Sequence, residues 1–438
     1  MSSTFDRLNN WARKSVTLKL FVIGFLILLL LIPANMLQSL IRERESLRNS
    51  AIEEVSAKWG LAQTIGGPVI SVPYTTSVID SEGKTISRTG YAHFLPDEIV
   101  IDGELTPEQR YRGIYVVVLY QASLRINGHF GPLNAAALQI PVGDLHWEDA
   151  LFTIGISDMA GVRDAISLVL NDTSLQFGPG TVTHDIFSAG ASVPIDLSER
   201  PDELRFAFNL QLNGSSTLSF LPFGKETRVS LSSPWTDPSF EGAFLPDERT
   251  VNDEGFRASW KVLHLNRNYP QQGEGAYIGK AADGRLALNA SDYDYNTKAY
   301  QQAANDPNAF GLRLLLPIDE YHKSMRTAKY AAFFIFITFL TFFFIEVLNR
   351  KRLHPIQYLL IGAAIILFYV LLVSIAEHLN FDTAYWISCA LIVLLITGYS
   401  AFVLGNRKLT FLVAAMLLVL YGFFYSILQL QDYALLLG

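Results

Sequence analysis

The spacing of its long apolar runs constrains this chain more than any other feature of the sequence. One apolar run of the roughly 20 residues that a membrane helix needs stands near the N-terminus, and four more follow a long polar stretch. Half of the residues are hydrophobic and only 17% are charged, a composition that soluble domains seldom have. The expected transmembrane helices are 20–41, 330–348, 356–376, 384–404 and 409–428. We therefore expect a membrane protein with a tail at 1–19 and an aqueous domain at 42–329.

The first apolar run has two possible interpretations. A basic flank precedes it, including Arg13, Lys14 and Lys19, and such a flank stays in the cytoplasm. A secretory signal peptide also follows positive charge, but it needs a small-x-small cleavage site. The residues after the run, Ala34 to Gln38, lack that site, so we predict an uncleaved anchor.

The next segment, Ile41 to Trp59, predicts a helix that continues the first span outward. Its apolar residues recur every three to five positions among charges of both signs, as in a solvated helix. Such a helix acts either as a lever between membrane and domain or as a plain stalk.

After Gly60 the pattern changes to short apolar runs between turn residues, which indicates strands. Leu204 to Leu212 alternates strictly, as a half-buried strand requires. Turns are expected at 81–84 and at Asn213-Gly214. The other expected strands are Val69–Tyr74, Ile114–Tyr120 and Arg228–Leu231. Together these runs predict a β-rich, sandwich-like domain with one or two lobes.

One short motif occurs twice, as Phe94-Leu-Pro-Asp-Glu98 and Phe244-Leu-Pro-Asp-Glu248. Equivalent turns in two duplicated lobes would explain the echo. Chance or shared turn chemistry would explain it equally.

Positive charges predict the orientation in the membrane. Three basic segments fall on one side of the expected helices: the N-terminal tail, Arg350 to Arg352, and Arg407-Lys408. The loop 377–382, on the other side, has no Lys or Arg. The positive-inside rule then places the N-terminus in the cytoplasm and the large domain in the periplasm.

Several kinds of site lack support in the sequence. A net charge of −7 argues against a nucleic-acid partner. The only cysteine is Cys389, so neither an intrachain disulfide nor a Cys-based zinc site can form. No nucleophile elbow, P-loop, dinucleotide fingerprint or zinc-protease motif is present. We therefore expect no enzyme activity, no cofactor and no catalytic or metal-binding residue.

Weaker patterns leave some alternatives open. Leu221 to Thr227 contains one Gly-Lys pair and favours a hairpin turn over a phosphate site. Asp283, Asp292 and Asp294 fit a solvated acidic loop better than a calcium loop. A metal site remains conceivable only across separate strands, from scattered histidines: His93, His129, His146, His184 and His264.

Three polar residues at the expected membrane boundary are the candidate functional positions: Glu346, Glu377 and His378. Ionisable groups at membrane depth are costly and often functional. Glu346 stands four residues before Arg350, which predicts an ion pair on one helix face. Near the water boundary, snorkelling lowers the cost of all three groups.

A series of motifs in a fixed order resembles the CreD family of inner-membrane proteins. In the first part of the chain they are Gly66–Pro68, Val72–Tyr74, Ser233–Trp235, Gly242–Pro246 and Trp260–Arg267. In the second part they are Leu314–Tyr321, Lys329-Tyr330, Glu346–Leu348, His354–Tyr358, Ser374–His378 and Asp432–Leu436.

This resemblance implies a Gram-negative inner-membrane protein linked to envelope integrity and to a two-component regulon associated with β-lactam response. It implies no known reaction, cofactor or ligand. Members of the family usually continue with another hydrophobic helix, so we expect 429–438 to be a tail or the start of a missing sixth helix.

The residues favour a non-enzymatic membrane protein whose outer domain senses, binds or supports something in the envelope. The resemblance implies that this periplasmic domain supports cell-envelope integrity. The expected partners of the protein are membrane lipids and unidentified periplasmic proteins or ligands. One alternative is a transporter or channel component for a small solute, using Glu346, Glu377 and His378. Another is an envelope hydrolase whose site is split across strands.

Overall fold

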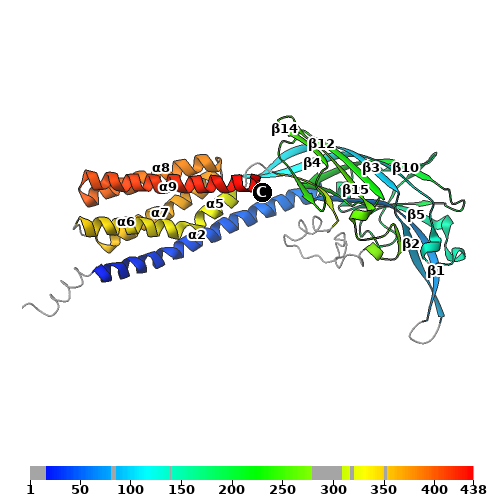
Figure 1. The fold of residues 1–438 in the computed structure, drawn as a ribbon, viewed down its shortest axis with the longest axis horizontal. Helices are drawn as coiled ribbons and strands as arrows, with labels where there is room; N and C mark the ends of the chain where they lie inside the picture. The colour runs from blue at the N-terminus through cyan, green and yellow to red at the C-terminus, as the bar shows by residue number, and fades with distance from the viewer. Residues whose placement is uncertain are drawn as a thin grey trace, which may run out of the picture. The chain divides into compact units, whose positions relative to one another are not determined.

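The chain divides into two compact units in the computed structural model, which describes residues 16–79, 85–138, 140–278, 308–315, 320–349 and 353–437. Residues 1–48 and 318–438 form a helical unit, and residues 49–317 form a β-rich unit. Figure 1 shows both parts of the chain.

The helical unit contains helices that are long and apolar enough to cross a membrane. Five of the described helices meet this requirement by length and composition. The described helices of the unit are α2 (Val16–Trp59, shared with the β-rich unit), α5 (Glu320–Lys329), α6 (Ala331–Leu348), α7 (Pro355–Ala376), α8 (Phe381–Leu404) and α9 (Arg407–Leu437). α2 runs to Trp59 without a break, which confirms the helix expected beyond Ile41.

The ends of these helices follow from their sequence. His354 is the N-cap of α7 and Pro355 stands in its first turn, where the missing N–H of proline costs nothing. Gly405 ends α8 in the left-handed conformation, with φ 56°, which glycine adopts readily. The joins between α6, α7, α8 and α9 are short, so neighbouring helices run antiparallel, as Figure 1 shows.

One glycine allows two helices to approach closely. A Cβ added at Gly362 of α7 would lie 2.1 Å from Leu30 Cδ1 of α2. Gly362 is therefore a site of helix packing. Gly398 and Gly422 are not close-packed in this way, because no described atom lies within 4 Å of a Cβ built there.

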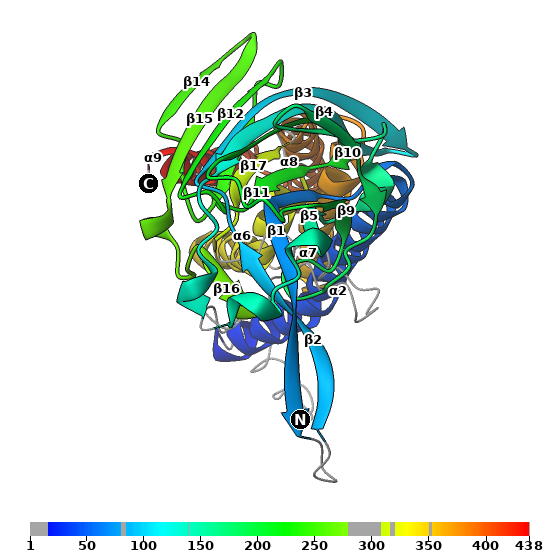
Figure 2. The same ribbon diagram turned by 90° about the vertical axis from the view of Figure 1, so that its right-hand side faces the viewer.

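The described strands of the β-rich unit form two mixed sheets. The nine-stranded sheet contains β13 (Pro238–Gly242), β17 (Phe310–Leu314), β11 (Thr217–Phe220), β1 (Gln63–Ile79), β5 (Ala150–Ile156), β9 (Gly190–Ile195) and β8 (Gly178–Pro179) in that order, with β2 (Thr85–Phe94) on β1 and β16 (Gln272–Glu274) on β2. The eight-stranded sheet is ordered β14 (Glu248–Asn252), β15 (Gly255–Leu263), β12 (Glu226–Ser233), β3 (Glu98–Arg112), β4 (Tyr115–Phe130), β10 (Leu204–Ser215), β6 (Ser167–Leu170) and β7 (Thr173–Gln176). Figure 2 views these strands from the side.

In each sheet, one parallel pair joins a strand from the first part of the β-rich unit to a strand from its second part. These pairs are β1 with β11 and β3 with β12, whereas the other described pairings within both sheets are antiparallel. On one side of each parallel pair lie strands from β1 to β10, joined by the late strand β16, which pairs with β2. On the other side lie the remaining strands from β11 to β17. The domain therefore has two lobes that share both sheets.

In each lobe the chain passes from the nine-stranded sheet to the eight-stranded sheet through a similar segment. Phe94-Leu95-Pro96 leads from β2 to β3, and Phe220-Leu221-Pro222 leads from β11 to β12. The crossovers meet where the Lys225 N–H donates to Pro96 O at 3.0 Å. Residues 221–225 thus form a sheet-to-sheet crossover and Glu226 begins β12, so the hairpin turn predicted at 221–227 is wrong.

The motif Phe244–Glu248 also connects the two sheets, from β13 to β14. It leads to an edge strand, whereas Phe94–Glu98 leads to the central strand β3. The counterpart of the first motif across the lobes is therefore the crossover after Phe220.

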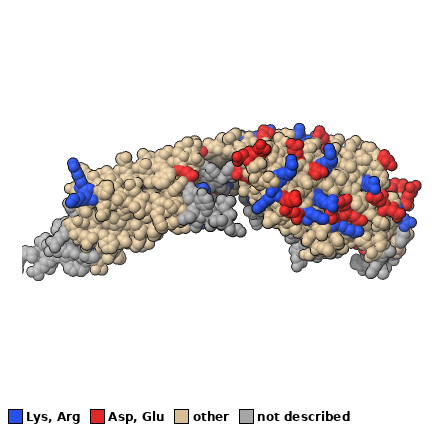
Figure 3. Space-filling model, turned by 45° about the horizontal axis from the view of Figure 1, so that its top comes forward, with Lys and Arg blue, Asp and Glu red and all other residues tan. Residues whose placement is uncertain are grey.

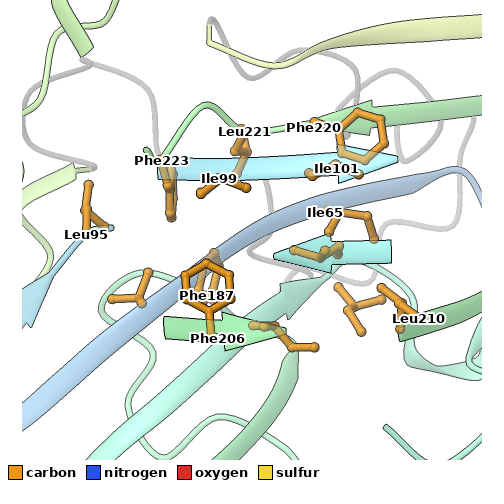
Figure 4. Close-up of a cluster of buried hydrophobic side chains, with 14 of the residues drawn as sticks. Ile65, Leu95, Ile99, Ile101, Phe187, Phe206, Leu210, Phe220, Leu221 and Phe223 are labelled. Carbon is orange, nitrogen blue, oxygen red and sulfur yellow. The ribbon is translucent and has the colours of Figure 1, made fainter. Parts of the chain in front are cut away.

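The core lies between the inner faces of the two sheets. Along β10 the buried residues Leu204, Phe206, Phe208, Leu210 and Leu212 alternate with more exposed ones, which confirms the predicted strand. Figure 4 shows side chains from both sheets meeting in this core, among them Ile65, Ile101 and Phe206. Asn213-Gly214 lies inside β10, so the predicted turn there is wrong. The predicted turn at 81–84 lies outside the described residues.

The two units differ in how many charged residues their surfaces carry. Figure 3 shows Lys, Arg, Asp and Glu dispersed over the β-rich unit, whereas the visible face of the helical unit carries few of them. A surface of mixed charges suits water. A nearly uncharged helical surface suits lipid.

Candidate functional site

Glu346, near the end of α6, is buried and hydrogen-bonded at both carboxylate oxygens. Only 3% of its side chain is exposed, and its Oε1 lies 2.5 Å from Lys19 Nζ of α2. Its Oε2 accepts a hydrogen bond from Tyr358 Oη of α7 at 3.0 Å. A buried carboxylate is stable only when it is paired and hydrogen-bonded, so this cluster of three side chains joins α2, α6 and α7.

The structure gives Glu346 a partner that the sequence does not indicate. The predicted pair with Arg350 stays a prediction, because Arg350 lies outside the described residues. Lys19 is 327 positions away in the sequence. No local spacing rule relates residues so far apart, so only the helix packing identifies this pair.

Glu377 lies at the C-terminal end of α7. One of its oxygens is 3.6 Å from Arg44 Nη1 of α2, and 13% of its side chain is exposed. This contact is a second ion pair that holds α2 against the helical unit. Because Arg44 is 41% exposed, solvent screening leaves the pair with a small contribution to stability.

His378 does not join either ion pair. Its side chain is exposed, and its backbone N–H donates to Ile375 O at 3.0 Å. Tyr358 and Glu377 stand 19 positions apart on α7, which corresponds to about 28 Å of helix. The structure therefore places Glu346 at one end of α7 and places Glu377 and His378 at the other.

In the β-rich unit, the end of α2 is fixed to the hairpin of β3 and β4. Arg112 Nη2 donates to both oxygens of Glu54 at 3.1 Å. The guanidinium of Arg110 lies 4.1 Å from the centre of the Trp59 ring, within the range of a cation–π contact. Trp59 Nε1 also donates to Tyr120 O at 3.3 Å. We call Glu54, Trp59, Arg110 and Arg112 the hairpin clamp.

A second polar cluster was not predicted from the sequence. His93 of β2 is fully buried, and its Nδ1 lies 2.8 Å from Ser71 Oγ of β1. Its Nε2 lies 3.3 Å from Asp185 Oδ2. Ser71 and His93 face each other in the β1–β2 register, which the sequence alone does not provide.

The order Ser-His-Asp invites comparison with a hydrolytic triad, but the burial of this cluster favours a structural role. A nucleophile must reach substrate, and only 3% of Ser71 is exposed. Tyr91 and Tyr277 both stack with the His93 ring, with ring centroids 6.4 and 6.3 Å from its centroid. The hydrogen bond from His93 lowers the pKa of Asp185 below its usual value, which stabilises the carboxylate in the folded protein.

Among the residues that the structure describes, no three His, Cys, Asp or Glu side chains gather as a set of metal ligands. Asp283, Asp292 and Asp294 fall outside those residues. The acidic loop predicted there stays a prediction.

Similarity to known proteins extends over nearly the whole chain. Residues 15–438 match the family described as Inner membrane protein CreD. The chain is also 32% identical to the Inner membrane protein CreD of Escherichia coli (strain K12) over 419 residues, which cover 94% of this chain and 87% of that protein. The motifs that resembled this family, the apolar helices and the two-sheet domain agree with this match. The chain therefore belongs to the CreD family of inner-membrane proteins.

Proposed function

We propose that this chain supports cell-envelope integrity, and the response to envelope or β-lactam stress, as a non-enzymatic protein of the inner membrane. In this proposal the β-rich unit lies in the periplasm, where it binds an envelope component. The helical unit holds it at the membrane and responds to its state.

The observation that carries the proposal is the sharing of α2 between the two units. Residues 16–48 of this helix cluster with the helical unit and residues 49–59 with the β-rich unit. Lys19 and Arg44 pair with Glu346 and Glu377 in the first. The hairpin clamp holds the helix in the second. A continuous helix that is fixed in both units can act as a lever. We therefore propose a lever for this segment rather than a plain stalk.

Charge supports the proposed orientation. Arg407 and Lys408 begin α9, whereas the join after α7 carries no Lys or Arg from Glu377 to Asp382. By the positive-inside rule the side with Arg407 faces the cytoplasm.

A complementation assay tests the proposal. A strain without the gene is supplied with the wild-type chain, with Arg112→Gln, or with Arg257→Gln. Arg257 is an exposed arginine of β15, so Arg257→Gln removes a similar charge outside the hairpin clamp. Growth is measured in detergent and in a β-lactam, with the amount of each variant in the membrane fraction.

We expect the wild-type chain and Arg257→Gln to restore growth, and Arg112→Gln to restore less at equal abundance. If the wild-type chain leaves growth unchanged, the envelope role is wrong. If Arg112→Gln restores growth fully, the lever is wrong and α2 is only a stalk.

A further inference from the structure

The helical unit carries an open groove between α6 and α9. Its volume is about 650 Å³, within the range of known small-molecule sites. Ile337 lines it from α6, and the remaining side chains come from α9: Lys408, Phe411, Leu412, Ala415, Met416, Val419, Leu420 and Phe423.

The lining is apolar except for Lys408. Phe411 and Phe423 stand at the rim with 75% and 63% of their surface exposed, whereas Leu420 on the floor is 9% exposed. The small Ala415 lies between the two rings along α9. The two large Phe rings on either side of the small Ala415 leave a groove that fits a flexible hydrocarbon chain.

The length of the groove matches one leaflet of a bilayer. Lys408 and Phe423 stand 15 positions apart on α9, or about 22 Å of helix. A bilayer is about 40–45 Å thick with its headgroups, so one leaflet measures about 20–22 Å. A lipid with its headgroup beside Lys408 would extend its chains as far as Phe423.

The polar end of the groove is suited to an anion. Arg407 and Lys408 form the first turn of α9. The Lys408 N–H donates to Asn406 Oδ1 at 2.9 Å, which caps the helix at this end. Lys408 forms no ion pair with any residue that the structure describes. A helix N-terminus with two cations attracts a phosphate.

We propose that this groove binds an anionic glycerophospholipid. An acyl chain lies between Ile337 and the α9 stripe, and the phosphate lies beside Lys408 and the first turn of α9. Basic pockets between membrane helices bind anionic headgroups in this way. The inference depends on neither the proposed function nor the orientation of the chain.

Native mass spectrometry of the purified full chain tests this site. Dioleoyl-phosphatidylglycerol and dioleoyl-phosphatidylcholine are titrated separately, because they share acyl chains and differ in net charge. The variants are Lys408→Gln, which removes the cation, and Ala415→Trp, which fills the floor. Lys329→Gln at the exposed end of α5 is the charge-matched control.

We expect saturable binding of phosphatidylglycerol and weaker binding of phosphatidylcholine. Lys408→Gln should weaken phosphatidylglycerol binding about five-fold, and Lys329→Gln should leave it unchanged. A folded Ala415→Trp variant should lose the bound lipid. Because Ala415→Trp can fail to fold, Lys408→Glu provides a second test, with a larger loss than Lys408→Gln.

Equal affinity for the two lipids would overturn the inference, and so would equal losses in Lys408→Gln and Lys329→Gln. A second copy of the chain on this face would also overturn it. That arrangement would give a disulfide-linked dimer of Phe411→Cys in a Cys389→Ser background.

Discussion

At the residue scale, the central feature is one buried carboxylate held by partners from two other helices. Glu346 is only 3% exposed and contacts Lys19 and Tyr358. Such a group stabilises packing only while its partners remain, because a buried charge without a partner is costly. The cluster therefore predicts strong coupling between Lys19 and Glu346.

Glu346→Gln and Lys19→Met should each lower the stability of the full chain by about 1–2 kcal/mol, a value reduced because Lys19 is 30% exposed. The double variant should lose less than the sum of the two changes. Thermal unfolding in detergent measures this cycle. Strict additivity would show that the two side chains do not interact.

A second residue-scale prediction concerns acid stability. Hydrogen bonding from His93 lowers the pKa of Asp185 in the folded protein. The contribution of this carboxylate to stability is complete above the usual Asp pKa of about 3.9. It is lost as the pH falls through the lowered folded value. Asp185→Asn should be less stable than wild type at pH 7, and the difference should shrink as the pH falls below 4.

Unfolding of the full chain, followed by intrinsic fluorescence between pH 3 and 7, measures this effect. Asp196→Asn is not a suitable control, because the pKa of Asp196 is also lowered, by Ser198. Asp172→Asn, on an exposed residue of the β6–β7 turn, is a better one. A constant difference between Asp185→Asn and wild type across the range would contradict the linkage.

At the scale of elements, Gly362 and Gly398 both stand within apolar helices, but only Gly362 is closely packed against another helix. Gly362→Leu should clash with Leu30 and destabilise the α2–α7 contact by about 1–3 kcal/mol. Gly398→Leu is the matched control, because no described atom lies within 4 Å of a Cβ built there. Thermal unfolding in detergent compares the two. Equal effects would mean that α2 does not pack on α7 as described.

Strand β10 allows a second test at this scale. Phe206→Ala and Phe208→Ala should each cost about 3–5 kcal/mol, because both rings are buried in the core. Asn209→Ala, on the exposed face, should change stability by less than about 0.5 kcal/mol. Chemical unfolding of the full chain measures all three. If both Phe variants are as stable as wild type, these rings do not lie in the core between the two sheets.

The sequence predicted the elements whose signal is local. Alternation identified β10, and apolar length identified the membrane helices. It failed where distant pairing decides the structure. Asn213-Gly214 is a good turn pair, but β10 continues through it because Asn213 and Gly214 pair with Gln121 and Tyr120 of β4. The Lys19–Glu346 and Ser71–His93–Asp185 contacts likewise depend on packing and register.

At the scale of the whole molecule, the family and the membrane class follow from sequence and structure together. The orientation of the chain rests on its charges, and the proposed function depends on it. A periplasmic β-rich unit can contact envelope components, whereas a cytoplasmic one cannot. The proposed function therefore rests on the claim that this unit lies on the periplasmic side of the membrane.

Cysteine accessibility tests that claim most directly, since the only native cysteine, Cys389, is buried and Cys389→Ser gives a clean background. Thr250→Cys on exposed strand β14 and Asn406→Cys between α8 and α9 are treated with a membrane-impermeant maleimide in spheroplasts. We expect labelling of Thr250→Cys in intact spheroplasts and of Asn406→Cys only after permeabilisation. The reverse pattern would contradict that claim.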